Sequence, residues 1–486
     1  MNRIKPCIIV LSLIILSSCK HEQATKSDFF SGDYWKSQAL NDIMPYWTRY
    51  SRDMTAGAFY TNLDSAWNTF GSLDKYPSMI SRHLFSYSAA YLLSGNAEDI
   101  VIADSTTKWL IRYAWDKEFG GWFDALDRNG NPVRTTKTTF VQVYAVTGLT
   151  LYYFATRDTT ALRYIERSND LLESKVWDKE SGGYYNVMNR DWSISDSNKS
   201  FSSQVTPVSG YLFYLYLATR EERYLNQINR ILDVTINNMV DPESGWVLED
   251  FERNWTYLEG REGASEINIG HNIEVAWMLL RNYLLTRNNT HLQAALSLAA
   301  KLSVAGFMKD NGIWLTSTGR LASSQQATDT YWWIQAYGNI FSLYLYRATG
   351  EIKYLADFRK GAAFWDSEFI DPVHGDTYFS VGKDGTVKDA TKATQFKTSY
   401  HSIEHCLLNM LCLNHWVNDA PVELNFRINA SDDGDRLFPV LLEDWDIRIQ
   451  RILIDGKDQT SRADNQAVVL PILVNSHIKV VLSNRD

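Results

Sequence analysis

Residues 270–285 read GHNIEVAWMLLRNYLL, and this stretch decides the fold. Apolar side chains occupy nearly every side of a helix built from it, which is typical of an interior helix rather than a surface one. His271 and Glu274 are the exceptions, and their spacing places them on one face near the N-terminus. Burial and the positive end of the helix dipole both favour a neutral imidazole, the form that accepts a proton. A capping histidine tied to a carboxylate for structural reasons explains the same spacing.

The other stretches with helical period fall into two sets. The more apolar set is predicted to form an inner ring, at residues 81–93, 140–155, 207–218, 271–285, 331–347 and 402–416. The second set mixes charged residues with Leu and Ile and is predicted to lie outside, at residues 34–50, 103–114, 161–173, 221–238, 292–305 and 354–369. Two concentric rings of helices predict an all-α (α/α)6 toroid over residues 33–418, with a central cleft at the N-termini of the inner helices.

A short motif recurs between the predicted helices: an Asp, one or two Gly a few residues later, and then aromatic residues. Its copies begin 61 to 69 residues apart, at Asp53, Asp116, Asp178, Asp241, Asp310 and Asp371. Each copy is predicted to be a turn that joins an outer helix to the next inner helix. The near-constant interval indicates an internal repeat of one helical hairpin per unit.

Residues 1–19 are predicted to be a lipoprotein signal peptide. A charged start precedes an apolar run that is too short to span a bilayer as a mature helix, and the run LSSC ends at Cys19, the expected lipidation site. Residues 20–32 are polar and are predicted to be a tether. We therefore expect export and a lipid anchor on a bacterial membrane, periplasmic or at the cell surface, with ordinary secretion as the alternative.

Residues 419–486 are predicted to form a small β domain, because polar and apolar residues alternate there between turn residues. A packing or spacer role is favoured, and carbohydrate binding is the alternative. Asp432, Asp433 and Asp435 are explained by an acidic turn, with a calcium site as the less common explanation.

The composition favours a carbohydrate partner. A formal net charge of -9 argues against nucleic acid or an anionic lipid surface. The chain has 17 Trp and 27 Tyr, which suit stacking on sugar rings, although most of them will fill a large helical core. Cys406 and Cys412 point away from each other on one predicted helix, so no disulfide is expected between them. No pattern in the sequence indicates an oligomeric state.

Two further residues complete a candidate site. His401 also stands at the start of an apolar predicted helix, and the fourth and sixth inner helices of the ring face the same lumen. Arg82 stands at the start of the first inner helix. Two imidazoles and a guanidinium suit proton abstraction next to a carbonyl, in which one histidine removes the proton, the guanidinium stabilises the oxyanion and the other histidine returns a proton. Alone, Arg82 would be explained by a surface or ion-pair role.

Four motifs resemble those of the N-acylglucosamine 2-epimerase and cellobiose 2-epimerase superfamily. They are GHNIEVAWMLL from Gly270, KTSYH ending at His401, WWIQA from Trp332, and Ser-Arg at Arg82 with Phe85. The resemblance covers nearly all of residues 33–416. It implies an (α/α)6 barrel and either sugar 2-epimerisation or aldose–ketose isomerisation without a cofactor.

The resemblance also implies roles for individual residues. His271 and His401 would be the acid/base pair, Glu274 the partner of His271, and Arg82 the oxyanion binder. The tryptophans would be platforms for the sugar. The expected substrate contacts are Trp332, Trp333, Gln335, Tyr400, Lys137 and Gln204.

Three positions depart from the family pattern. The segment that opens the third inner helix reads SQVTPVS over residues 203–209, without the histidine and carboxylate that family epimerases carry there. Tyr337 stands where the family usually has Glu, and Glu404 stands where it often has Arg. A different reaction on the same scaffold, or a non-catalytic glycan-binding protein, therefore stays open.

Other reaction classes are compatible with the same residues. A glycoside hydrolase or unsaturated-uronyl hydrolase would pair Glu274 with Asp329, Asp376 or Glu266. A polysaccharide lyase would use His271 with Tyr400. Residues 401–405 read HSIEH and match a metalloprotease pattern, but no other zinc-binding context accompanies them.

Overall fold

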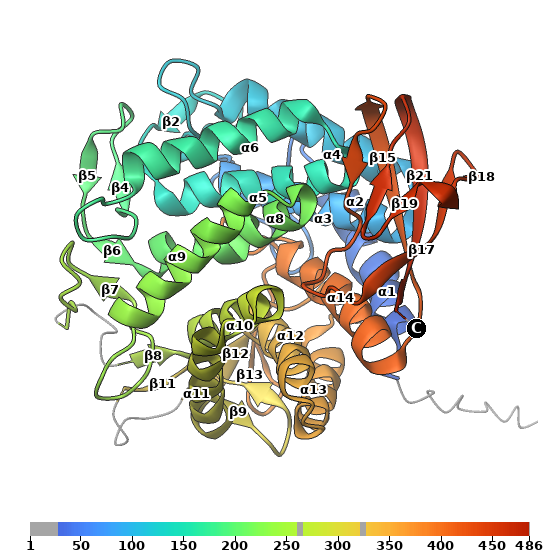
Figure 1. The fold of residues 1–486 in the computed structure, drawn as a ribbon. Coiled ribbons are helices and arrows are strands. Elements are labelled where there is room, and N and C mark those ends of the chain that lie inside the picture. Colours follow the sequence, from blue (N-terminus) through green and yellow to red (C-terminus); the bar gives the residue numbers. More distant parts are fainter. Residues whose placement is uncertain (1–27, 260–265, 321–326, 486) are drawn as a thin grey trace, which may run out of the picture.

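The structure is a computed structural model that describes residues 28–259, 266–320 and 327–485. Within these ranges, helices are arranged around a ring, and the C-terminal strands gather at one side of it (Figure 1). The inner helices are α3 (Pro77–Ser94), α5 (Thr139–Thr156), α7 (Phe201–Gln204) continued by α8 (Phe213–Thr219), α10 (Ile269–Thr286), α12 (Trp332–Thr349) and α14 (Tyr400–Cys412). Neighbouring inner helices contact one another, and contacts between α14 and α3 close the ring.

The outer helices lie between the inner ones in sequence. They are α1 (Gly32–Ser37) with α2 (Met44–Tyr50), α4 (Ala97–Trp109), α6 (Thr159–Leu171), α9 (Glu222–Asn238), α11 (Asn289–Ala305) and α13 (Lys353–Phe364). π-Helical turns interrupt or extend several helices, at Gln38–Ile43, Leu110–Ala114, Leu172–Val176, Val208–Leu212, Trp365–Phe369 and Leu413–Asn418. The predicted (α/α)6 toroid and its assignment of inner and outer helices are confirmed.

Burial explains which helices lie inside. Nearly every residue of α3, α5 and α10 is buried, polar ones included, because these helices are covered on all sides. In α9, by contrast, the buried residues fall on one face and charged residues cover the other. The all-round apolar pattern of the quoted stretch therefore identified an interior helix correctly.

Short strands form a belt at the N-terminal end of the inner ring. They are β1 (Ala125–Leu126), β2 (Pro132–Arg134), β3 (Lys137–Thr138), β4 (Val187–Met188), β5 (Ile194–Asp196), β6 (Lys199–Ser200), β7 (Asp250–Phe251), β8 (Glu266–Asn268), β9 (Phe307–Met308), β10 (Ile313–Trp314), β11 (Ser317–Gly319), β12 (Asp329–Tyr331), β13 (Ser380–Gly382) and β14 (Val387–Asp389). The segment that leads into an inner helix pairs with the loop of the next unit in β3–β4, β6–β7, β8–β11 and β12–β13. The belt thus joins each helical hairpin to its neighbour.

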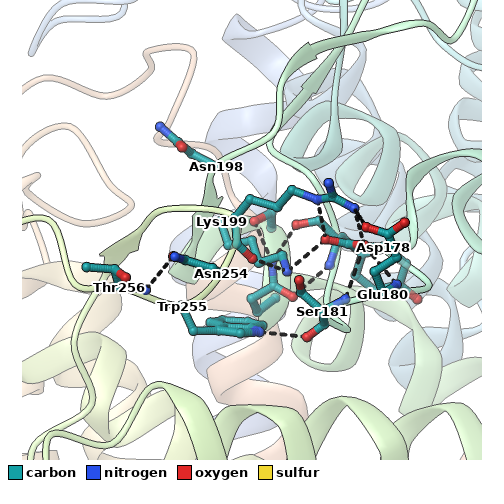
Figure 2. A network of polar contacts seen from close by, with 12 residues as sticks. Asp178, Glu180, Ser181, Asn198, Lys199, Asn254, Trp255 and Thr256 are labelled. Carbon is teal, nitrogen blue, oxygen red and sulfur yellow. Dashed lines mark hydrogen bonds and ion pairs between the residues drawn. The ribbon is translucent and has the colours of Figure 1, made fainter.

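Buried ion pairs reinforce this belt at the repeated Asp residues. Asp178 accepts a hydrogen bond from Lys199 at 3.2 Å and binds Arg253 of the following loop, while the Trp255 indole donates to the Ser181 carbonyl (Figure 2). Asp53 and Asp116 each bind a lysine and an arginine in the same way. Burial alone would raise the pKa of Asp116, but Arg190 and backbone N–H groups lower it to about 2.

The fifth copy of the motif is an exception to the prediction. In the other copies, the amide of the following glycine donates to the carbonyl of the repeated Asp, as Gly182 does to Asp178. In the fifth copy, Gly312 donates to Met308, so Met308 and not Asp310 occupies the Asp position. Asp310 is exposed because it lies inside the turn rather than at its start.

The C-terminal strands form two antiparallel sheets. One has the order β15 (Val422–Ser431), β21 (Leu473–Asn484), β17 (Ile447–Ile454) and β18 (Lys457–Asp458), and the other joins β16 (Arg436–Leu437), β20 (Ala467–Val469) and β19 (Ala463–Asp464). A 3-10 turn at Thr460–Arg462 precedes β19. This domain packs on the toroid, since contacts join β15 to α3 and α5.

The predictions for the N-terminal segment fall mostly outside the described residues. The signal peptide at residues 1–19, Cys19 and most of the tether lie outside them. The last tether residues are described and are packed, with Phe30 on the ring of Phe358 at 5.9 Å. Cys406 and Cys412 are buried and free, as predicted. Over the described ranges, no helix combines the length and the apolar character needed to cross a membrane.

Candidate functional site

His271 stands in the first turn of α10. The side chain of Asn268 caps this helix by accepting a hydrogen bond from the His271 amide. The imidazole stacks on Phe201 with 3.9 Å between ring centroids, and its Nδ1 lies 2.5 Å from Oε1 of Glu249. The His271 side chain is 24% exposed, so one side of the ring remains accessible.

Glu249 reverses the predicted charge preference of His271. Burial alone would lower the pKa of His271, as the sequence reasoning held, but the Glu249 carboxylate and its hydrogen bond outweigh burial and raise that pKa. Glu274, expected to be the partner of His271, lies one turn further along α10. It is buried, its Oε1 has no hydrogen-bond partner among the described residues, and burial raises its pKa. The direct partner of His271 is therefore Glu249.

His401 is the second residue of α14 and is 7% exposed. Its ring contacts Tyr337 at 5.1 Å and Trp332 at 5.8 Å between centroids. Its Nδ1 has no hydrogen-bond partner among the described residues. Burial, followed by the positive charge of Arg82, holds the pKa of His401 well below its ordinary value, so this imidazole is neutral at neutral pH.

One indole ring joins the two histidines. Trp333, in the first turn of α12, lies 5.5 Å from His271 and 6.2 Å from His401 between ring centroids. Gly270 makes this approach possible, since a Cβ at that position would overlap the Trp333 indole. The two imidazoles, which are distant in sequence, therefore meet around a common aromatic surface.

Arg82 is buried beside His401 and holds the segment that leads into α14. Its guanidinium donates to the backbone carbonyls of Gln395 at 2.7 Å and Phe396 at 2.8 Å. It also lies over the Tyr144 ring, 5.0 Å from the centroid. Burial lowers the pKa of Arg82, but an arginine stays charged at neutral pH. Arg82 thus positions the α14 N-terminus in addition to placing a positive charge near His401.

A buried carboxylate lies beneath His401. Glu404 accepts hydrogen bonds from Tyr214 at 2.5 Å, Tyr400 at 3.1 Å and Tyr337 at 3.3 Å. Burial raises the pKa of Glu404 to about 7, against the opposing effect of these hydroxyls and of Arg281. Tyr337 and Glu404 are the two single-residue departures from the family pattern, and they are in contact with each other.

Three of the predicted substrate contacts have structural partners in the described residues. Lys137 is fully buried and pairs with Asp116 at 3.2 Å. The Gln204 amide bonds to both backbone groups of Tyr184, which ties α7 to the preceding loop. The Gln335 amide bonds in the same way to backbone groups at Trp314, Gly312 and Gly361.

The residues of the alternative reactions have other partners. Asp376 is buried and pairs with Lys397 at 3.2 Å, and Glu266 is exposed. Asp329 accepts from the Thr316 hydroxyl at 3.1 Å. Tyr400, the lyase candidate, donates to Glu404, and burial raises its pKa well above the ordinary value, so its phenol stays protonated at neutral pH.

The described residues do not support a metal centre. No group of three or more His, Cys, Asp or Glu side chains is arranged there to hold a metal ion. In the HSIEH pattern, the His405 ring packs against Trp365 at 4.5 Å and Trp35 at 4.8 Å, so it faces other neighbours than His401 does.

Glu249 was missed because its partner lies on another element, 22 residues away. The internal repeat contains a signal that identifies it. Asp124, Asn186 and Glu249 each stand two residues after the bridge residue of their turn, at Trp122, Tyr184 and Val247. Asp124 accepts from Thr138 and Asn186 from Ser200, both at the start of the next inner helix. This repeat position therefore supplies an acceptor to the start of the next inner helix, and in the fourth unit the acceptor meets a histidine.

Comparisons with known proteins agree with this fold and identify a family. The family model for N-acylglucosamine 2-epimerase (GlcNAc 2-epimerase) matches residues 57–405. The chain is 27% identical over 382 residues to the cellobiose 2-epimerase of Bacteroides fragilis, a match that covers 75% of this chain and 95% of that protein. Two solved structures have a similar fold, and both are sugar epimerases or isomerases by name.

Cellobiose 2-epimerase from Bacillus thermoamylovorans B4167 has a TM-score of 0.71 at 22% identity, covering 78% of this chain and 98% of that one. A D-mannose isomerase has a TM-score of 0.73 at 19% identity, covering 80% of this chain and all of the other.

Proposed function

The chain belongs to the N-acylglucosamine 2-epimerase family, and from this premise we propose a carbohydrate epimerase or isomerase that transfers a proton between two histidines and the carbon next to a sugar carbonyl. The substrate class is a mono- or oligosaccharide with a reducing end. His401 and His271 are the proposed acid/base pair, and no cofactor takes part in the proposed steps.

One observation carries the proposal: two imidazoles with opposite charge preferences contact the same indole ring. His401 has a pKa well below the ordinary value and is therefore neutral, the form that can accept a proton. His271 has a raised pKa because of Glu249 and favours the protonated form. General acid–base catalysis needs such a pair of opposite states on one substrate.

In the proposed reaction, neutral His401 removes the C2 proton of an open-chain aldose. The C–H electron pair becomes the C1–C2 double bond of an enediolate, and the carbonyl electrons move to O1. The positive charge of Arg82 favours this oxyanion. Protonated His271 then returns a proton to the other face of C2, which gives the C2 epimer. Return of the proton to C1, with the O2 hydroxyl proton moving to O1, gives the ketose.

Isotope exchange tests this proposal. The protein is incubated with reducing disaccharides and monosaccharides in deuterated water, and C2 is followed by NMR. We expect deuterium at C2, with exchange reduced about 100- to 10,000-fold in His271→Ala and in His401→Ala. His374→Ala, in the turn that follows Asp371, is the matched histidine control and should exchange at the normal rate.

Other products would identify the alternatives. A new reducing end would indicate hydrolysis and a new double bond would indicate elimination. Full-rate exchange in either catalytic variant would show that the two-base mechanism is wrong. Sugar binding without any reaction would indicate a non-catalytic glycan-binding protein.

A further inference from the structure

The C-terminal β domain closes the end of the inner ring opposite the two histidines. It touches the C-terminal end of each inner helix that the structure describes. The contacts are Asn425 to Leu92 of α3, Phe426 to Phe154 of α5, Gln466 to Arg220 after α8, Trp445 to Leu285 of α10, Asp444 to Arg347 of α12, and Asp444 to Trp416 after α14. The family model ends at residue 405, before this domain begins.

One charged residue of this domain reaches into the toroid. Glu443 is 1% exposed and lies between Leu442 and Asp444 in the segment that joins β16 to β17. Its carboxylate accepts two hydrogen bonds from Arg281 of α10, at 2.6 and 2.8 Å, and one from Tyr344 of α12 at 2.7 Å. Burial disfavours the charged guanidinium, but Glu443 outweighs burial and raises the pKa of Arg281. The pair is fully desolvated.

Arg281 links Glu443 to the aromatic side chains between the inner helices. Its guanidinium lies over the ring of Tyr214, 4.9 Å from the centroid. The Tyr214 hydroxyl donates to Glu404, which also accepts from Tyr400 and Tyr337. The Tyr337 ring in turn contacts His401 at 5.1 Å. A continuous chain of buried groups thus runs from the β domain to the proposed base.

We infer that Glu443 is a positioning residue of the site: it holds Arg281 in place and balances its charge, and so controls whether Glu404 beneath His401 is ionised. The inference rests on the proposed function for its effect on the reaction. The β domain then contributes to the proposed active site, rather than being a spacer or a separate glycan-binding module.

The sign of the effect follows from the charges that face Glu404. These are the hydroxyls of Tyr214, Tyr337 and Tyr400, the more distant Tyr144, and the Arg281 guanidinium. If Glu443 is neutralised, Arg281 keeps its charge without a counter-ion, and the stronger positive potential lowers the pKa of Glu404. If Arg281 is removed together with the charge of Glu443, that positive potential is lost and the pKa of Glu404 rises.

The experiment compares Glu443→Gln with the double variant Arg281→Met/Glu443→Gln in the full chain. Glutamate labelled with carbon-13 at the carboxyl group reports the Glu404 titration by NMR, and Glu404→Gln assigns the signal. We expect the Glu404 pKa, about 7 in the unaltered protein, to fall by about one pH unit in the single variant and to rise in the double variant. The limb of the C2-exchange pH profile near pH 7 should move in the same two directions.

Glu423→Gln, an exposed position on β15, is the matched control and should leave both titrations unchanged. Opposite shifts cannot come from general loosening of the fold, which would move both variants the same way. Equal shifts, or an unmoved Glu404 titration, would overturn the inference, and a moved titration with an unmoved pH profile would overturn its link to the reaction. A protein without C2 exchange would instead contradict the proposed function, while the Glu404 titration would still test the coupling.

Discussion

The two ends of the inner ring contain similar chemistry in opposite settings. At the N-terminal end, His271 is partly exposed and is paired with Glu249, whose side chain is 38% exposed. At the C-terminal end, Arg281 and Glu443 are both fully buried under the β domain. Buried polar atoms without partners among the described residues occur at both ends, as Nδ1 of His401 and Oε1 of Glu274 at the N-terminal end and Nη1 of Arg281 at the other.

This difference indicates a structural role for the C-terminal end of the ring and a catalytic role for the N-terminal end. Buried polar atoms without partners are costly and are retained where a ligand or a reaction uses them. A desolvated ion pair resists change instead, because removing either partner leaves a buried charge without its counter-ion. The same six inner helices therefore provide a rigid closed base and an adaptable open site. Substitutions at the two ends should differ in both size and kind of effect.

The largest effect is expected from Arg281→Met at the closed end. The variant leaves the Glu443 carboxylate buried without its cation, which should reduce the free energy of unfolding by about 3–5 kcal/mol. Urea denaturation measures this difference. Arg287→Met, an exposed position at the same end of α10, is the control. A loss no larger than that of the control would contradict the picture of a rigid closed end.

A smaller effect is expected from Lys199→Met in the belt around the open end. Asp178 loses one charged hydrogen bond but keeps Arg253, so the loss of unfolding free energy should be about 1.5–3 kcal/mol. The same denaturation measurement applies, with exposed Lys179→Met, in the turn that follows Asp178, as the control. If Lys199→Met cost more than Arg281→Met, the order of the two ends would be reversed.

The smallest effect, and the one that separates chemistry from stability, is expected from Glu249→Gln. Without the Glu249 charge, burial dominates at His271 and its pKa falls. As the pH rises, His271 therefore loses its proton at a lower pH than in the unaltered protein. The basic limb of the C2-exchange profile should move to lower pH, with a rate about tenfold lower above neutrality. NMR titration of His271 checks the same shift, and exposed Glu252→Gln serves as the control. A basic limb that stayed in place would show that His271 is not the acid of the reaction.

Local patterns predicted most of the fold and part of the site. The all-round apolar pattern of residues 270–285 and the repeated Asp–Gly turns identified the inner helices, because periodicity and turn chemistry act over a few residues. Met308 in place of Asp310 was missed because the turn retains its backbone hydrogen bond without the Asp. The backbone partners of Gln204 and Gln335 were not predicted, because a sequence does not show which way a polar side chain points in a buried helix.

The sequence by itself determined the toroid, its six repeats and the two histidines at helix starts, since each depends on residues close together in the chain. The tertiary structure alone decided the charges of those histidines. Glu249 meets His271 from 22 residues away, and Glu443 reaches Arg281 from 162 residues away. A pKa depends on burial and on charges within a few ångströms in space, so chain folding, and not local sequence, determines it.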